Sequence, residues 1–214
     1  LRHDEITPQE RVLLESLREE AARMGRVVDN LLTLARIDDG HLDLLSTPED
    51  LLELARRAVR THSAAAAAAG VDLDVSGQSV VVACDRDRVD QVVGNLIDNA
   101  IRVSPVGGTI RAQVTRDGDA ARLSIADEGP GIPSDERERI FERFARIDRA
   151  RGRGGGAGLG LAISREIVAA HGGRLEVDPT ESRGATFVIV LPAVYAEGTG
   201  LPGSGRPPGA RRPV

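Results

Sequence analysis

The sequence contains no lysine and no tryptophan, and only 2% of its residues are aromatic. Because all 28 basic residues are arginines, the chain lacks the lysine with which a P-loop contacts phosphate, and it has no lysine nucleophile. With so few aromatic residues, the core must be filled by valine, isoleucine, leucine and alanine. Tryptophan fluorescence will not report on folding.

Cysteines and long apolar runs are also scarce. Cys84 is the only cysteine, which excludes an intrachain disulfide and fits a reducing compartment. We expect it to be a small buried apolar residue. No apolar run approaches the roughly 20 residues of a membrane-spanning helix, and no signal peptide is visible. The net charge of -5 argues against non-specific binding to nucleic acid.

The two ends of the sequence differ from its middle. The 214 residues suffice for one well-buried domain and an appendage. The chain begins at Leu1 rather than at a methionine, and its opening has the character of an internal stretch, so we expect a piece of a longer protein. From about Ala196 onward glycine, proline and arginine dominate, and we expect this tail to be disordered.

A long helix is predicted from Thr7 to about Asp38. Residues 7–10, Thr-Pro-Gln-Glu, have the sequence of a capping box with proline at the first helical position, which fixes where the helix begins. Apolar residues then recur at alternating spacings of three and four. They form a heptad seam of Leu14, Leu17, Ala21, Met24, Val28, Leu31 and Ala35. Such a seam favours a coiled coil or a helical bundle over a lone surface helix.

The rest of the chain alternates between helical and strand patterns. A second helix is predicted to open with Thr47, Pro48 and Glu49 and to run to about Ala69. Six strands are predicted at residues 71–75, 79–83, 109–114, 122–127, 174–177 and 185–192. The third and fourth are joined by Asp117-Gly118, which predicts a β-hairpin. Together these elements suggest a layer of helices against a sheet.

Asn95 and Asn99 lie one helical turn apart in a segment that Asp85 can cap. Their amide oxygens face the same way and can hold a hard cation such as Mg²⁺. Arg102 follows on the same face, where a phosphate would sit. The opposite face is apolar and is predicted to be buried: Val89, Val92, Val93, Leu96, Ile97 and Ala100. Residues 104–108 are predicted to end this helix.

Asp127 closes a predicted strand, and Gly129 and Gly131 then turn the chain away with little side-chain bulk to block a flat base. A carboxylate at that edge can accept a hydrogen bond from an exocyclic amine such as that of adenine. Alone, Asp-x-Gly-x-Gly is ordinary turn sequence. Its value comes from its position between the other motifs.

Gly156, Gly158, Leu159 and Gly160 lead into an amphipathic helix that is predicted to reach His171. Exposed backbone N–H groups and a helix N-terminus would then face one place, which suits phosphate. A dinucleotide-binding fingerprint is the competing interpretation. No strand precedes this run, however, and its glycine spacing departs from G-x-G-x-x-G.

Two further segments complete the set of candidates. Residues 141–144, Phe-Glu-Arg-Phe, precede an arginine- and glycine-rich run from Arg149 to Gly156, which cannot pack a core and which we interpret as a lid. Thr186, in the last predicted strand, is a further candidate donor to phosphate.

These segments resemble, in this order, the catalytic part of bacterial two-component sensor histidine kinases, and the resemblance covers nearly everything from Thr7 to Pro192. Residues 95–102 resemble the family's N box, 127–131 its first glycine box, 141–144 its F box and 156–161 its second glycine box. Residues 31–38 resemble the end of the second dimerisation helix, which separates sensor kinases from gyrases and heat-shock chaperones.

The resemblance implies an α+β protein with a Bergerat-type ATP-binding fold: a two-layer α/β sandwich, with a mixed sheet and helices on one face, preceded by a long dimerisation helix. It divides the chain into part of the dimerisation hairpin at residues 1–39, a linker at 40–48, the catalytic domain at 49–193 and a tail at 194–214. It implies ATP and Mg²⁺ as cofactors. The implied partners are a second copy and a response-regulator receiver domain, without nucleic acid or membrane contact by this stretch. The implied location is the cytoplasmic side of a membrane, with the anchoring segments upstream.

Roles also carry over by position. Asn99 becomes the main Mg²⁺ ligand, Asn95 contacts metal or phosphate, Arg102 contacts phosphate and Asp127 binds adenine. The remaining implied contacts are Gly129 and Gly131 beside the base, Gly156, Gly158, Leu159 and Gly160 around the phosphates, and Arg143 and Arg146 as weaker candidates on the lid. Two positions depart from the family: Val103 stands where an aromatic residue often lies beside adenine, and Ala157 replaces a frequent threonine or serine.

The family's phosphoacceptor histidine lies on a first dimerisation helix, in a box that His3 and the five residues after it superficially match. Thr7 and Pro8 are already explained as a helix cap, and one continuous helix to Asp38 leaves no room for a first helix and a turn. We therefore expect the acceptor to lie upstream. The other histidines, His41, His62 and His171, form no metal-like cluster and are expected to be surface or link residues.

Phosphoryl transfer from Mg-ATP to a histidine, and from there to a response-regulator aspartate, is the reaction that the resemblance implies. Two alternatives share the ATP site. A non-catalytic interaction module would close its lid on nucleotide without chemistry. A serine kinase of the anti-sigma-factor type would lack a long dimerisation helix, so the heptad seam argues against it.

Overall fold

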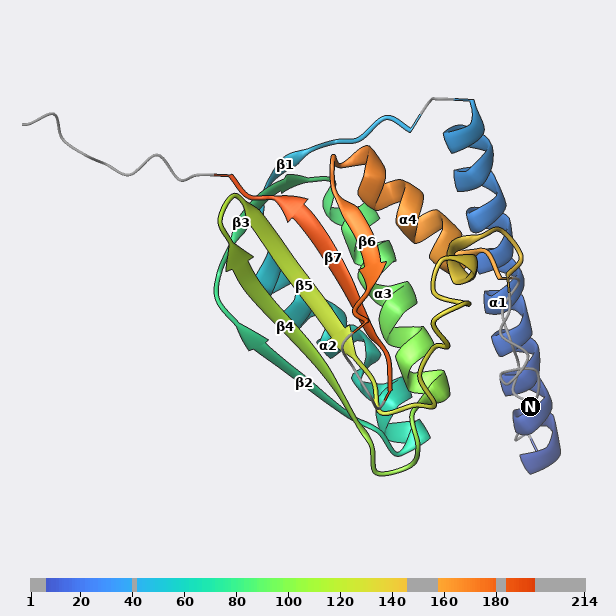
Figure 1. Ribbon diagram of the computed structural model, residues 1–214. Coiled ribbons are helices and arrows are strands. Elements are labelled where there is room, and N and C mark those ends of the chain that lie inside the picture. The colour runs from blue at the N-terminus through green and yellow to red at the C-terminus, as the bar shows by residue number, and fades with distance from the viewer. Residues whose placement is uncertain (1–6, 40–41, 146–157, 180–183, 195–214) are drawn as a thin grey trace, which may run out of the picture.

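The computed structural model describes residues 7–39, 42–145, 158–179 and 184–194. In this part of the chain a five-stranded sheet carries helices on one face, and a long N-terminal helix lies beside them (Figure 1). The elements are α1 Pro8–Asp38, β1 Thr47–Asp50, α2 Leu51–Ala69, β2 Asp72–Gly77, β3 Val81–Cys84, α3 Arg86–Val103, β4 Thr109–Asp117, β5 Ala120–Ala126, the 3-10 turn η1 Arg139–Phe141, α4 Gly160–Ala170, β6 Arg174–Val177 and β7 Thr186–Pro192. The predictions for His3, His41, Arg146, Gly156, the arginine- and glycine-rich run and the tail fall outside the described residues.

The main sheet has the strand order β2-β4-β5-β7-β6. Strand β2 pairs parallel with β4, and every other neighbouring pair is antiparallel. The predicted mixed sheet with helices on one face is therefore confirmed. The predicted hairpin is confirmed as well: Asp117 pairs with Ala120, so its loop is Gly118 and Asp119, one residue later than expected.

The predicted start of the second helix at Thr47 is wrong. Thr47–Asp50 is a strand that pairs antiparallel with β3, in a small second sheet. Helix α2 begins only at Leu51, because the Asp50 carboxylate accepts a hydrogen bond from the Leu52 N–H and thereby acts as the N-cap. The expected linker boundary between residues 48 and 49 thus falls inside β1.

Helix α3 is held by burial of one face. Its N-cap is Asp85, as predicted, with the side chain accepting a hydrogen bond from the Arg88 N–H at 3.1 Å. All six apolar residues of the predicted inner face are buried: Val89, Val92, Val93, Leu96, Ile97 and Ala100. The helix ends at Val103, with Ser104 as its C-cap. Since the inner face fixes the helix rotation, the side chains of Asn95 and Asn99 are held at its edge.

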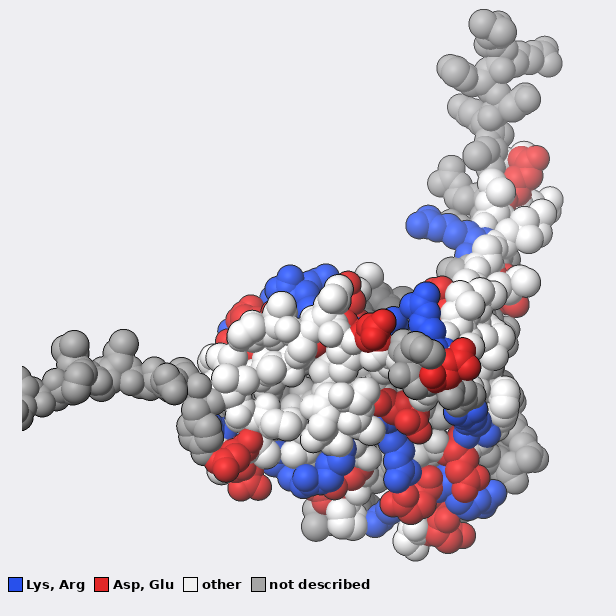
Figure 2. All heavy atoms as spheres, turned by 90° about the horizontal axis from the view of Figure 1, so that it is seen from above, with Lys and Arg blue, Asp and Glu red and all other residues white. Residues whose placement is uncertain are grey.

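Helix α1 has two apolar faces. The predicted capping box at Thr7 is present. Near its C-terminal end, Thr33 and Leu34 are buried, and Leu34 joins the core of the domain where α1 contacts α4. The heptad seam faces solvent instead, with Leu14, Leu17, Met24, Val28 and Leu31 each about half exposed or more. Figure 2 shows α1 projecting beyond the rest of the molecule. On the face seen in this view, acidic and basic side chains are mixed.

No helix in the described ranges is long and apolar enough to cross a membrane.

Cys84 is fully buried at the end of β3, as expected for a small apolar residue. Burial, with added repulsion from Glu49, Asp85 and Asp90, raises the pKa of its thiol from 9.0 to about 11. The folded state therefore keeps the thiol proton to a higher pH than the unfolded state does.

This shift predicts a loss of stability in alkali. The stabilising contribution is complete below about pH 9 and disappears as the pH rises toward 11. We expect the free energy of unfolding to fall across this range more steeply in the wild type than in Cys84→Ala. Urea unfolding followed by circular dichroism measures this without tryptophan. Parallel pH profiles for the two proteins would contradict the assignment.

Candidate functional site

The side chain of Asn95 joins α3 to the beginning of α4. Its Nδ2 group lies 3.5 Å from the Gly160 carbonyl oxygen and 3.4 Å from Ser164 Oγ. A Cβ atom on Gly160 would lie 3.5 Å from the Asn95 amide carbon, which is ordinary van der Waals contact, so the two residues are immediate neighbours. Ser164 is fully buried. These contacts hold the amide nitrogen against α4.

Asn99, one turn later, is half-buried and contacts a positive charge. The Arg102 guanidinium donates a hydrogen bond to Asn99 Oδ1. The amide oxygen that was predicted to hold a metal cation therefore already accepts a hydrogen bond from a positively charged group. Arg102 itself is exposed. The two asparagines therefore have different environments: Asn95 faces α4, whereas Asn99 lies at the rim with Arg102.

Asp127 is the buried carboxylate of this region, with only 4% of its surface exposed. Its Oδ1 atom accepts hydrogen bonds from the Gly129 N–H at 2.8 Å and the Ala185 N–H at 3.2 Å. The Asp127 N–H donates in turn to the Ala185 carbonyl oxygen. The carboxylate at the end of β5 is thus fixed by backbone groups from the turn that follows it and from the chain that enters β7.

Glycines allow the chain to pass closely around Asp127. A Cβ on Gly129 would lie 2.8 Å from Asp127 Oδ1 and 2.9 Å from Val103 Cγ2. Gly131 has φ +73, and a Cβ there would lie 2.8 Å from the Gly184 carbonyl oxygen. Val103, at the end of α3, therefore packs against the glycine turn. The predicted glycines are required here by close approach and by backbone conformation.

The segment beyond Phe141 is anchored at its two described ends. The Phe144 N–H donates to the Gly158 carbonyl oxygen at 2.9 Å. Phe144 has a left-handed backbone conformation, with φ 64, and the residue is 65% exposed. A Cβ on Gly158 would lie 2.8 Å from the Phe144 carbonyl carbon, so only glycine fits there. Phe141, in contrast, is buried edge-on against Phe187.

Helix α4 begins without a side-chain cap. Leu159 is its N-cap residue, and no side chain accepts a hydrogen bond from the first turn. The N–H groups of that turn are therefore available to an anion. Since Asn95 contacts Gly160, these donors lie beside the asparagine face of α3.

The sequence-predicted residues form two groups. Asn95 lies with Gly160, and Asn99 with Arg102, at the rim between α3 and α4. Asp127, Gly129 and Gly131 lie together at the end of β5, next to β7. Thr186 belongs to this second group because it pairs with Ala126. Its buried hydroxyl lacks a hydrogen-bond partner among the described residues. Arg143 is exposed beside Phe144.

Sequence reasoning missed three residues of the site. Ser164 lies four positions after Gly160, a polar residue on the buried face of an apolar helix, and that pattern was a usable signal. Gly184 and Ala185 contact Asp127 only because β7 pairs with β5, 58 residues away along the chain. No spacing rule connects them.

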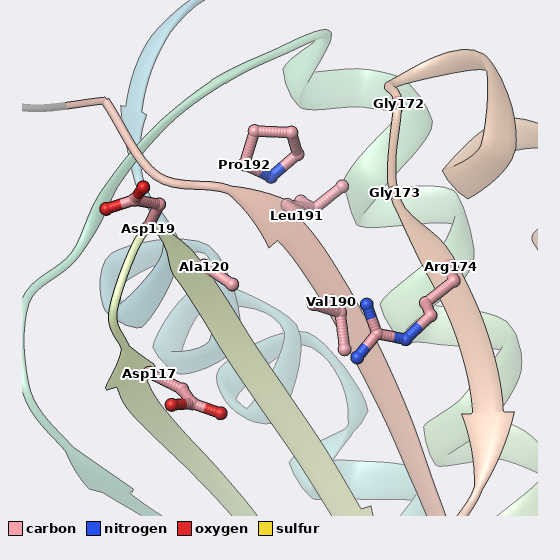
Figure 3. A pocket seen from close by; sticks show the side chains of 9 residues that line it. All are labelled: Asp117, Asp119, Ala120, Gly172, Gly173, Arg174, Val190, Leu191 and Pro192. Atoms are coloured by element: carbon pink, nitrogen blue, oxygen red, sulfur yellow. The ribbon is translucent and has the colours of Figure 1, made fainter.

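A separate pocket of about 460 Å³ lies at the opposite end of the sheet (Figure 3). It is lined by the β4–β5 turn, by Gly172, Gly173 and Arg174, and by the end of β7. Because Ala120 begins β5 and Ala126 ends it, this pocket and Asp127 occupy opposite ends of one strand. The pocket is therefore not part of the candidate site.

Histidine and acidic side chains do not form a metal centre within the described ranges, since no group of three or more gathers there. The expectation that His62 and His171 are surface or link residues needs refinement. Both are half-buried, and each Nδ1 lies within hydrogen-bond distance of the carbonyl oxygen four residues earlier.

Gly184 offers a direct test of how Asp127 is supported. Gly184 has φ +79, and a Cβ there would overlap the Asp127 carbonyl oxygen. Gly107 has nearly the same conformation, φ +80, but a Cβ there meets nothing within 4 Å. We expect Gly107→Ala to cost about 1 kcal/mol and Gly184→Ala about 3 kcal/mol more, measured by urea unfolding. Equal costs would show that Gly184 does not support Asp127.

Comparison with known proteins identifies the family to which this chain is similar. The family model for histidine kinase-, DNA gyrase B-, and HSP90-like ATPases matches residues 84–195. The chain is 33% identical over 182 residues to the alginate biosynthesis sensor protein KinB of Pseudomonas aeruginosa, and covers 30% of its length. It is 38% identical to the sensor protein IrlS of Burkholderia pseudomallei, covering 39% of that protein. These alignments use 84% and 86% of the present chain.

Solved structures agree. Full-length ShkA in complex with AMPPNP superposes with a TM-score of 0.76 at 30% identity, over 90% of this chain and 40% of that one. The mycobacterial sensor histidine kinase MprB superposes with a TM-score of 0.62 at 34% identity, over 70% of this chain and 98% of that one. The chain therefore belongs to the histidine kinase-, DNA gyrase B- and HSP90-like ATPase family and contains the catalytic ATP-binding domain of a bacterial sensor histidine kinase.

Proposed function

We propose that this chain binds Mg-ATP and transfers its γ-phosphoryl group to a histidine of the same sensor kinase, from which the group passes to an aspartate of a response regulator. One observation carries the proposal: the asparagine face of α3 lies against the glycine-led N-terminus of α4. This arrangement combines amide oxygens, an arginine and free backbone donors, which are groups suited to a metal-bound triphosphate.

Adenine is assigned to the end of β5. Asp127 Oδ1 is held by two backbone N–H groups, so the carboxylate has a fixed orientation and can accept a hydrogen bond from the exocyclic amine. The unsatisfied hydroxyl of Thr186 lies in the neighbouring strand. It therefore suits the base, directly or through water, better than the phosphate contact that the sequence suggested. Gly129 and Gly131 let the chain turn tightly beside Asp127, at the edge assigned to the base, and Val103 packs against Gly129 as an aliphatic wall.

The phosphates and Mg²⁺ are assigned to the rim between α3 and α4. The fit to a cation is supported by Asn99 Oδ1, which already accepts a hydrogen bond from the Arg102 guanidinium. Asn99 would hold the metal, with Asn95 on metal or phosphate and Arg102 on phosphate. Bound Mg²⁺ would offset negative charge on the phosphate oxygens. Gly156, Gly158, Leu159 and Gly160 would line the phosphates, with Arg143 and Arg146 as candidates on a closing lid.

In the proposed reaction the chain's residues position charge and provide no covalent nucleophile. The backbone N–H groups at the start of α4 and the Arg102 guanidinium stabilise charge on the transferred group. A histidine nitrogen attacks the γ-phosphorus in line, the bond to the β-phosphate oxygen breaks and leaves ADP, and the imidazole loses its proton to water. We place that histidine on a first dimerisation helix, and not at His3.

Dimerisation is assigned to α1. Its exposed heptad seam has the pattern that two helical hairpins bury when they form a four-helix bundle. We propose residues 1–39 as part of that hairpin and 194–214 as a tail, with the chain on the cytoplasmic side of a membrane. Because β1 begins at Thr47, the start of the proposed catalytic domain moves from residue 49 to residue 47, which leaves 40–46 as the linker.

Isothermal titration calorimetry with Mg-ATP tests the site. We expect Asn99→Ala to weaken binding at least about tenfold, because a charge-assisted contact is lost. Asp127→Asn should weaken it to a similar degree, because an amide nitrogen replaces an acceptor while one oxygen still receives the backbone N–H groups. Asp98→Ala is the matched control: Asp98 is the exposed neighbour of Asn99 and lies near His62.

Transfer is tested by adding a separate domain that carries the acceptor histidine. Binding with transfer of radiolabelled phosphate supports the kinase. Binding without transfer favours an ATP-gated interaction module, and a wild type that binds no nucleotide overturns the assignment of the site.

A further inference from the structure

One imidazole joins the ends of two helices at the side of the molecule remote from Asn99. His171 is the C-cap residue of α4, and its Nε2 accepts a hydrogen bond from the Asp85 N–H at 2.9 Å. Since Nε2 accepts, the ring proton must lie on Nδ1. Nδ1 then donates to the Ile167 carbonyl oxygen at 2.7 Å, in the last turn of α4, and the His171 N–H approaches the same oxygen at 3.3 Å.

The N–H group that His171 binds belongs to the N-cap of α3. In a capping box this group is satisfied by a glutamate or glutamine three residues later. Here that position is Arg88, which cannot accept a hydrogen bond. His171, 86 residues away along the chain, supplies the acceptor instead. The start of α3 is therefore completed by α4 rather than by its own sequence.

The same two helices also meet at the candidate site. Asp85 at the start of α3 contacts His171 at the end of α4, whereas Asn95 contacts Gly160 and Ser164 near the start of α4. The helices therefore run antiparallel, side by side under the sheet (Figure 1). Ten residues of α3 separate the two contacts, or about 15 Å. The His171 contact thus fixes the sliding position of one helix against the other.

Asp85 brings a third segment to this point. Its Oδ2 atom accepts a hydrogen bond from the Leu45 N–H at 3.0 Å, while Oδ1 accepts from the Arg88 N–H. Burial alone would raise the pKa of Asp85, but the N–H groups of Leu45 and Arg88 and the Arg88 charge outweigh it and lower the pKa. Leu45 lies between α1 and β1, and its side chain is 82% exposed. The hydrogen bond from the Leu45 N–H to Asp85 is therefore the contact by which Leu45 is held to the domain.

We propose that Asp85 and His171 are positioning residues for the nucleotide site, and that they couple this site to the segment that follows α1. The inference rests on the proposed function of the rim between α3 and α4. Displacement of Leu45 acts on the Asp85 carboxylate, hence on the first turn of α3 and, through His171, on α4. Those two helices carry the groups assigned to metal and phosphate.

Coupling of this kind is reciprocal, so nucleotide must act on Leu45 as Leu45 acts on nucleotide. A purely structural role would lower stability without this dependence. His171→Asn keeps a donor for the Ile167 carbonyl oxygen but loses the acceptor for the Asp85 N–H. His171→Gln restores an acceptor at the position of Nε2. Asp85→Asn keeps the N-cap to Arg88 and removes the acceptor for Leu45.

The experiment measures Mg-ATP affinity by calorimetry and amide protection by hydrogen exchange. We expect His171→Asn to bind Mg-ATP about fivefold more weakly than wild type, at the lower end of typical couplings, and His171→Gln to bind normally. Mg-ATP should slow exchange of the Leu45 amide in wild type, but not in His171→Asn or Asp85→Asn. His62→Asn is the matched control, because His62 makes the same bond to the carbonyl oxygen four residues earlier within α2.

The proposal is wrong if His171→Asn binds Mg-ATP as tightly as wild type, or if His171→Gln does not restore the affinity. It is also wrong if His62→Asn loses as much affinity as His171→Asn, or if Mg-ATP does not change the exchange rate of the Leu45 amide in wild type. Failure of the proposed function has a different signature, since wild type would then bind no nucleotide. In that case hydrogen exchange alone tests the contacts among His171, Asp85 and Leu45: the Asp85 and Leu45 amides must lose protection together in His171→Asn.

Discussion

The structure depends on burial of one face of α3 against the sheet. Six aliphatic side chains of that helix are buried, and three of them, Val92, Val93 and Leu96, have no exposed surface. Each contributes about 1.5 to 3 kcal/mol when removed from water. Their spacing fixes how the helix is rotated, so the polar residues between them are held at the rim. The candidate site is thus positioned by apolar packing on the opposite face of the helix.

Local sequence chemistry predicted most of the elements correctly, because periodicity and caps are local properties. The capping box at Thr7, the N-cap at Asp85 and the buried face of α3 are confirmed. The start of α2 was wrong because Thr47 and Pro48 resemble a helix start, whereas pairing with β3 made the segment a strand. Backbone pairing with a distant strand leaves no trace in a local pattern.

The site was predicted unevenly for the same reason. Asn95 and Asn99 are close in sequence, so helix geometry alone predicted that they share a face. Gly184 and Ala185 reach Asp127 through strand pairing, and His171 reaches Asp85 through helix packing. The roles of Asn95, Asn99, Arg102 and Asp127 stay predictions that ligand binding will test. Membership of the ATPase family, in contrast, is shown by the match over residues 84–195.

Helix α1 has a mechanical property that follows from where it is held. Its 31 residues form a rod of about 46 Å, and the buried contact with the domain lies near its C-terminal end, at Thr33 and Leu34. About 39 Å of helix, from Leu34 back to Pro8, therefore extends on the far side of that contact. A tilt of about 10° at Leu34 would move the tip sideways by about 7 Å. A change too small to disturb the core at one end becomes, at the other end, a sideways displacement comparable to the spacing between packed helices.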